Sequence, residues 1–200
     1  MNTVKKFIPQ TRRELDIKIN QDSAWGNIPT ILHDIISRFN IKTNKAIEFG
    51  VEYGYSTAAL ANYFDKVTGV DIFTGDEHAG YKGDIYEETK NNLIGYQGIE
   101  LIKKSYQEYI INNNERYDFA HVDIIHTYED TFKCGEWCVL HADVVIFHDT
   151  LSFPEVFKAC LDLSRKYNLD FYNYEESYGL GILVKKSKFR TFLSKFLSKK

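Results

Sequence analysis

Apolar positions along this chain fall into short runs and helical stripes that alternate almost from end to end. Short apolar runs predict seven strands, at residues 46–49, 67–70, 99–102, 117–123, 143–149, 171–174 and 181–184. Stretches with apolar residues at helical spacing predict helices at about residues 29–39, 56–61, 84–94, 106–111, 128–140 and 153–167. This alternation predicts one α/β domain with a doubly wound, mostly parallel, seven-stranded sheet whose last strand runs antiparallel.

Three segments fall outside this alternation. Residues 1–22 are polar with scattered apolar positions, which predicts an irregular arm. Residues 73–84 are rich in glycine and charge, which predicts a lid loop over a site. Residues 186–200 carry phenylalanines and leucines at helical spacing among basic residues, which predicts a basic amphipathic helix. This helix packs on the domain or on a second subunit of a homo-oligomer, or else it contacts an anionic membrane surface.

The composition is that of a single globular domain. Of the 200 residues, 44% are hydrophobic and 26% are charged, and the net charge of −3 argues against nucleic acid as the main partner. The 3 cysteines form no zinc pattern. No apolar run approaches the roughly 20 residues of a membrane span, and the beginning of the chain lacks a signal sequence. We therefore expect a cytoplasmic protein, held at the inner membrane surface if its C-terminal helix binds lipid.

The segment from Ala46 to Phe73 contains a strand, a glycine loop, a helix and a second strand, which together form a βαβ unit. Gly50 and Gly54 follow the first strand, where a backbone without Cβ atoms lets a ligand approach. The second strand ends at Asp71, about 20 residues after Gly50, which is the separation expected for a carboxylate that binds ribose hydroxyls. This pattern predicts a nucleotide-binding half.

Polar side chains gather at the ends of the strands at 117–123 and 143–149. Asp123 is followed by His126, and His148 is followed by Asp149. Strand ends converge on one crevice in a doubly wound sheet, so these groups and Asp71 are expected to meet there. Three carboxylates and two imidazoles would repel or desolvate one another unless a positively charged ligand or a divalent metal were bound. The alternative is that each acid only caps the helix that follows it.

The glycine loop resembles the first motif of class I S-adenosylmethionine-dependent methyltransferases. Glu48, Gly50 and Gly54 spell ExGxxxG, and in that family the acid and the glycines hold the methionine half of the cofactor. The resemblance implies that S-adenosylmethionine binds here. Its ribose would then lie at Asp71, and Ser105 and Tyr106, just after the third strand, are candidates for the adenine.

Two later segments, YDFAHVDIIHTYED and DVVIFHDT, resemble the motifs of methyltransferases that modify sugars in polysaccharide and macrolide pathways. The resemblance implies that Asp123, which also adjoins the cofactor, binds a metal and that His126 is the general base. The remaining metal ligands fall on His148 and Asp149, and the metal would be Mg²⁺ or Mn²⁺. Members with full metal sites often carry an acid at the position of His148, so this chain departs from the pattern there.

A GDxHAG segment in the lid resembles methyltransferases associated with glycosyltransferases, which implies that Asp76 and His78 contact the substrate. The predicted reaction is O-methylation of a small-molecule or glycan acceptor, in which His126 removes the proton from a sugar hydroxyl while Asp123 and Asp149 position it. Two other functions stay open. One is an NAD-dependent oxidoreductase, although GxGxxG is absent, and the other is a nonenzymatic binding or assembly subunit that retains the fold.

Overall fold

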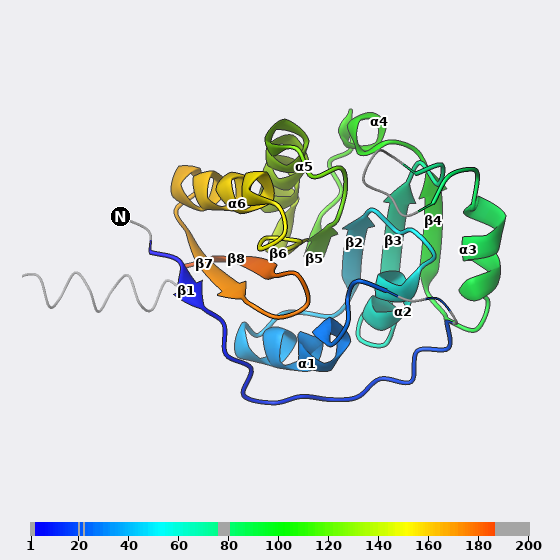
Figure 1. Ribbon diagram of the computed structural model, residues 1–200, viewed down its shortest axis with the longest axis horizontal. Helices are drawn as coiled ribbons and strands as arrows, with labels where there is room; N and C mark the ends of the chain where they lie inside the picture. Colours follow the sequence, from blue (N-terminus) through cyan, green and yellow to red (C-terminus); the bar gives the residue numbers. More distant parts are fainter. Residues whose placement is uncertain (1–2, 20, 22, 76–80, 187–200) are drawn as a thin grey trace, which may run out of the picture.

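The computed structural model describes residues 3–19, 21, 23–75 and 81–186 of this chain. These residues form one sheet of 8 strands with helices on both of its faces (Figure 1). The strands are β1 (Lys5–Lys6), β2 (Lys45–Phe49), β3 (Lys66–Asp71), β4 (Ile99–Lys103), β5 (Tyr117–Val122), β6 (Ala142–His148), β7 (Leu169–Tyr174) and β8 (Leu180–Lys185). The helices are α1 (Ile28–Arg38), α2 (Tyr55–Ala61), α3 (Tyr86–Asn92), α4 (Tyr106–Ile110), α5 (Tyr128–His141) and α6 (Pro154–Lys166).

The strand order across the sheet is β1-β7-β8-β6-β5-β2-β3-β4. Neighbouring strands are parallel except at β8, which runs antiparallel to both β6 and β7. The predicted α/β fold, with its mostly parallel sheet and antiparallel last strand, is therefore confirmed. The seven predicted strands and the six helices predicted between residues 29 and 167 each correspond to an element of the structure, with small differences at the ends, where boundaries are least sharply defined.

The arm at residues 1–22 differs from its prediction because it contains the strand β1. This strand lies beside the edge strand β7, with Lys5 opposite Tyr172 in parallel register. The Lys5 ammonium group lies 2.8 Å from a carboxylate oxygen of Asp170 and 4.9 Å from the centre of the Tyr172 ring. Edge strands tolerate lysine because its charge discourages further pairing, and two lysines give no apolar signal. Phe7, which is buried, then anchors the arm in the core.

Helices on the two faces create the crevice in which a ligand can bind. α1 and α2 cover one face with apolar side chains, including Ile31, Leu32 and Leu60. α5 and α6 cover the other face, with Trp137 and Leu163 in a second apolar cluster. Adjacent strands β2 and β5 are followed by helices on opposite faces, so the chain diverges where these strands end. Such a switch point opens a crevice at the carboxyl ends of the strands.

Two of the predicted segments fall partly or largely outside the described residues. The central part of the lid, 76–80, is one of them, and it contains the predicted substrate residues Asp76 and His78. The C-terminal helix predicted at 186–200 lies outside the description beyond Lys186. Within the part that the structure describes, no helix is long and apolar enough to cross a membrane.

Candidate active site

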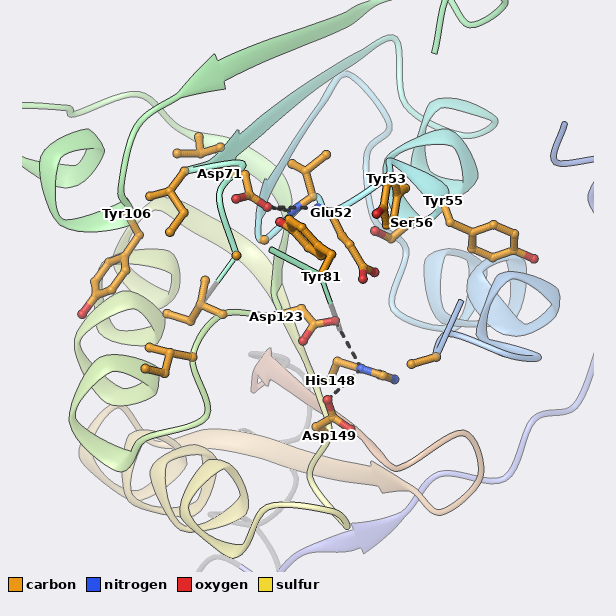
Figure 2. A pocket seen from close by; sticks show the side chains of 18 of the residues that line it. Glu52, Tyr53, Tyr55, Ser56, Asp71, Tyr81, Tyr106, Asp123, His148 and Asp149 are labelled. Atoms are coloured by element: carbon orange, nitrogen blue, oxygen red, sulfur yellow. Dashed lines mark hydrogen bonds and ion pairs between the residues drawn. The ribbon is translucent and has the colours of Figure 1, made fainter. Parts of the chain in front are cut away.

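A cavity of about 520 Å³ lies at the carboxyl ends of β2, β3, β5 and β6 (Figure 2). Its walls come from the loop after β2, the end of β3, residues 104–107, residues 123–126 and the end of β6. From here on, the arm denotes the described residues up to Asn27, which directly precedes α1, and it adds residues 21 and 23–25 to the wall. Among the described residues, the lining includes the carboxylates of Glu52, Asp71, Asp123 and Asp149 but only the single lysine Lys104. The imidazoles of His126 and His148 line the wall as well, so its net charge depends on their protonation.

Asp71 holds the loop after β2 in place. One of its carboxylate oxygens accepts hydrogen bonds from the backbone N–H groups of Val51 at 2.7 Å and Glu52 at 3.0 Å. The other oxygen accepts from the backbone N–H of Phe73 at 2.7 Å. Asp71 also lines the cavity, as predicted, so its carboxylate stands where it can both support the loop and meet a ligand.

Gly50 lines the cavity too, but the structure gives a reason for this glycine that does not involve a ligand. Its φ angle is +88°, and a Cβ atom here would lie 1.7 Å from the backbone oxygen of Asp123. The ends of β2 and β5 therefore approach each other too closely for any side chain at this position.

Glu48 and Gly54, which the sequence also assigns to the cofactor, are not among the residues that line the cavity. Glu48 is fully buried, with one carboxylate oxygen 2.8 Å from Nδ1 of His121 and the other accepting a hydrogen bond from the hydroxyl of Thr57. Gly54 begins α2 with a φ of +91°, and a Cβ atom there would lie 2.9 Å from the side chain of Leu93. Their positions support structural roles behind the glycine loop rather than direct contact with the cofactor.

Two histidines and two aspartates meet at one side of the cavity, and three of them are drawn in Figure 2. His126 Nε2 lies 3.4 Å from Asp123 Oδ1 and 3.1 Å from Asp149 Oδ2. His148 Nδ1 lies 3.2 Å from Asp123 Oδ2 and 3.3 Å from Asp149 Oδ2. We call these four residues the ionic cluster. The predicted convergence of these strand ends is therefore present in the structure.

Other contacts fix the orientation of both imidazole rings. The ring of His126 stacks on Phe153, with ring centres 4.0 Å apart and planes 10° from parallel. Nε2 of His148 lies 3.1 Å from the backbone oxygen of Ser177, so this nitrogen carries a proton that it donates to the carbonyl. The second nitrogen of His148 is thereby directed at the two carboxylates.

The ionic cluster shifts the pKa of each of its members. Burial by itself would lower the pKa of both imidazoles, but the charges and hydrogen bonds of Asp123 and Asp149 raise the pKa of His126 to about 9 and that of His148 to about 10. Burial would raise the pKa of both carboxyl groups, yet the two imidazoles hold the pKa of Asp123 well below its usual range and lower that of Asp149. At neutral pH the free cluster therefore consists of two imidazolium and two carboxylate groups. We expected a bound cation to relieve the repulsion, but protonated histidines already relieve it.

The cluster also fits a divalent metal. Asp123, His148 and Asp149 each offer a ligand atom, and these atoms lie within 4.8 Å of one another. Nδ1 of His148 is buried and lies 3.2 Å from an oxygen of Asp123 and 3.3 Å from an oxygen of Asp149. Its other nitrogen is held by a backbone carbonyl, which is the usual arrangement behind a metal-bound histidine. One imidazole and two carboxylates suit Mn²⁺ better than Mg²⁺, which prefers an all-oxygen site.

Ser105 and Tyr106, the candidates for the adenine, both line the cavity, although their polar groups have other partners. Ser105 caps α4, since its hydroxyl oxygen accepts from the backbone N–H of Glu108 at 3.2 Å. The hydroxyl of Tyr106 donates to Asp130 at 2.6 Å, and Figure 2 shows this side chain directed away from the middle of the cavity. Any contact with an adenine would therefore use the backbone or the ring.

Several lining residues were not identified from the sequence. Glu52 adopts a left-handed φ of +53°, and desolvation followed by repulsion from Asp123 and Asp71 raises its pKa. Its position inside the glycine loop is the signal that would have found it. Tyr53 of the glycine loop and Tyr81 of the lid bring their ring centres to 5.4 Å. Trp25 is buried and also lines the cavity.

Comparisons with known proteins agree with this geometry. Residues 47–150 match the model of a family described as a methyltransferase domain. A curated relative, the uncharacterized protein y4gI of Sinorhizobium fredii (strain NBRC 101917 / NGR234), is 30% identical over a 122-residue alignment that covers 55% of this chain. The matched region is only 13% of that protein, so this chain spans a small part of its length.

Solved structures share the fold. The O-methyltransferase NovP superimposes with a TM-score of 0.63 at 15% identity, covering 81% of this chain and 79% of that chain. The O-methyltransferase TomG from Streptomyces achromogenes, solved in complex with SAM, gives a TM-score of 0.57 at 11% identity and covers 84% of this chain and 92% of its own. At these identities the similarity concerns the fold.

Proposed function

Because this chain belongs to the methyltransferase domain family, we propose that it transfers a methyl group from S-adenosylmethionine to a hydroxyl group of a sugar or glycan. The observation that carries the proposal is the position of the ionic cluster on the wall of the cavity at the switch point of the sheet. There a general base and a cofactor can meet the same acceptor oxygen.

The cavity suits S-adenosylmethionine in charge and in size. The cofactor carries a positive sulfonium and a positive ammonium group, and the carboxylates of Glu52 and Asp71 line the cavity outside the ionic cluster. A volume of about 520 Å³ lies in the range of cofactor sites. We assign Asp71 to binding the ribose and the backbone of Gly50 and Val51 to binding the methionine end of the cofactor. All three residues line the cavity, and Asp71 holds the loop in place through the backbone N–H of Val51.

The acceptor oxygen forms its new bond to the methyl carbon as the bond from that carbon to the cofactor's sulfur breaks. A sugar hydroxyl is too weak an acid to attack unaided, so its proton passes to the imidazole of His126 during the attack. Asp149 and Asp123 orient this imidazole, and Phe153 fixes its plane. Holding the two reacting groups in line supplies much of the acceleration, because the entropy of bringing them together is lost on binding.

The raised pKa of His126 sets a condition on this role. At neutral pH an imidazole with a pKa of about 9 is mostly protonated and cannot accept a proton. A cationic ligand near Asp123 and Asp149 would compete for their charge and bring the pKa of His126 back toward its ordinary value. A divalent metal held by Asp123, His148 and Asp149 would have this effect, and when bound it would also make the acceptor hydroxyl more acidic.

A titration and a transfer assay test the proposal. S-adenosylhomocysteine should bind in calorimetry, whereas NAD should not, and labelled S-adenosylmethionine should methylate at least one nucleotide sugar in a panel. His126→Ala should lower turnover by about 100-fold or more with nearly unchanged cofactor affinity. His33→Ala, which removes an exposed imidazole on α1, is the matched control and should be fully active. Full turnover in His126→Ala would reject the base.

The same assay addresses the metal. A chelator should lower turnover, and added Mn²⁺ should restore it in the wild type but not in Asp149→Asn. Full activity in the chelator would rule out the metal while leaving the base intact. Binding of NAD instead of S-adenosylhomocysteine would overturn the proposed function as a whole.

A further inference from the structure

The turn between β7 and β8 adopts an unusual backbone. Ser177 and Tyr178 have φ angles of +49° and +65°, in the left-handed region that L-residues avoid. Gly179 follows with a φ of +93° and donates its N–H to the backbone oxygen of Glu176 at 3.0 Å. Backbone strain of this kind persists only where the surroundings enforce it, and it is often found at ligand sites.

The turn is held from the side of the ionic cluster. His148 Nε2 donates to the backbone oxygen of Ser177 at 3.1 Å. The backbone N–H groups of Leu151 and Ser152 donate to the backbone oxygen of Tyr178 at 2.9 and 3.3 Å. These bonds join the turn to the segment that directly follows Asp149, so its position is tied to that of the cluster.

The arm holds the turn from the other side. The hydroxyl of Ser177 donates to Asn27 Oδ1 at 2.8 Å and accepts from the backbone N–H of Asn27 at 3.3 Å. A Cβ atom at Gly26 would lie 2.8 Å from the same hydroxyl, so arm and turn are in close contact. Two networks therefore enforce the strained conformation.

A shallow hollow lies between the arm and the turn. It is lined by Ser23, Ala24, Gly26, Ser177 and Tyr178. Ser23 and Ala24 also line the main cavity, so the two spaces adjoin. No charged side chain lines the hollow among the described residues, which favours a neutral ligand over a phosphate or a carboxylate.

Tyr178 lines this hollow and is mostly exposed. The residue is 59% exposed, although the turn that carries it is held by the five hydrogen bonds to Ser177 and Tyr178 described above. Its ring centre lies 6.4 Å from that of His148, at an interplanar angle of 80°. Its hydroxyl has no hydrogen-bond partner in the part of the chain that the structure describes. The result is a rigidly placed aromatic surface beside the reacting groups.

We propose that Tyr178 is the platform on which the acceptor's sugar ring stacks, so that one of its hydroxyls reaches past His148 to His126. An aromatic face attracts the weakly polarised C–H face of a pyranose ring, while the edge of that ring keeps its hydroxyls free for polar partners. The hollow offers this combination, an aromatic face with serine hydroxyls and no charge. This inference rests on the proposed function, because it names the binding group for that acceptor.

Saturation-transfer NMR tests the platform with simple probes. The full chain with S-adenosylhomocysteine is mixed with methyl β-D-glucopyranoside, methyl β-D-galactopyranoside or catechol. In the wild type and in Tyr178→Phe, at least one glycoside should receive saturation, mainly on the C–H protons of one ring face. Tyr178→Ala should lower this signal by about five-fold or more, while the Kd for S-adenosylhomocysteine stays within about two-fold, which shows that the cofactor side is intact.

Equal saturation of a glycoside in Tyr178→Ala and the wild type would overturn the inference, as would saturation of catechol alone or of no probe. These outcomes leave the proposed function separately measurable. If S-adenosylhomocysteine binds and label is transferred to a nucleotide sugar, but Tyr178→Ala leaves the KM for that sugar unchanged, only the platform is wrong. If S-adenosylhomocysteine does not bind the wild type, the proposed function itself fails.

Discussion

Replacing Asp71 with alanine removes a carboxylate that accepts three backbone hydrogen bonds, from Val51, Glu52 and Phe73. Hydrogen bonds to charged groups contribute about 1.5–3 kcal/mol each, but Asp71 is only half-buried, so water replaces part of what is lost. We expect S-adenosylhomocysteine binding to weaken by about 1–3 kcal/mol, which corresponds to roughly 5- to 150-fold in Kd.

This loss of affinity would arise either from a lost contact with the ribose or from a lost support of the loop. A thermodynamic cycle that combines the Asp71→Ala variant with an altered ligand separates the two. Calorimetry gives the Kd of S-adenosylhomocysteine and of its 2′-deoxy analogue for the wild type and for Asp71→Ala. If Asp71 binds the ribose hydroxyl, the two changes are coupled by about 1 kcal/mol or more, because removing either partner removes the same bond. If Asp71 only supports the loop, the two losses add to within about 0.5 kcal/mol.

Asp65→Ala is the matched control, since this exposed acid lies just before β3 while Asp71 ends the same strand. It should leave both Kd values unchanged. Unaltered affinity in Asp71→Ala would refute the placement of the cofactor altogether. Additive losses would refute the ribose contact and leave Asp71 as a support of the loop.

Two further predictions concern stability. Gly50→Ala places a Cβ atom 1.7 Å from a backbone oxygen and should lower the melting temperature sharply or prevent folding. Gly95→Ala is the control, because a Cβ atom there meets nothing within 4 Å, and it should change the melting temperature little. Equal melting temperatures of the two variants would contradict this prediction. The pKa values of His126 and His148 are raised to about 9 and about 10, so their stabilisation is complete below their ordinary pKa of about 6.5 and is lost as pH rises through these values. The melting temperature should therefore fall above about pH 9, and less so in Asp123→Asn; an identical fall in both proteins would show that the cluster is not the cause.

Periodicity predicted the sheet and the helices because each of them buries one face within a short stretch of sequence. The cofactor-binding half of the site could also be predicted, because Gly50 and Asp71 belong to a single βαβ unit within a short stretch of sequence. Both residues line the cavity. The convergence of Asp123, His126, His148 and Asp149 followed from a rule about strand ends in doubly wound sheets.

The side-chain pairs between neighbouring strands could not be predicted from the sequence. Glu48 lies opposite His121 in the register of β2 and β5, and the two side chains pair in the core. Without the strand order, an acid in a glycine motif looks like a ligand for the cofactor, whereas its partner is a residue 73 positions away. Gly54 is a similar case, because Leu93 of the segment after α3 occupies the space that its missing side chain leaves.

The side of the site that we assign to the acceptor is built from segments that are still farther apart. Asn27 of the arm and Ser177 of the turn are separated by 150 positions, and Arg12 and Glu176 by 164. Neither segment has a periodic pattern, so no local rule brings them together. This arrangement separates two requirements: the cofactor needs a compact βαβ unit, while the acceptor meets an arm and a turn that can vary without disturbing that unit. A change of acceptor therefore needs changes in these two segments, and residues such as Tyr178 can be replaced while the cofactor side keeps its structure.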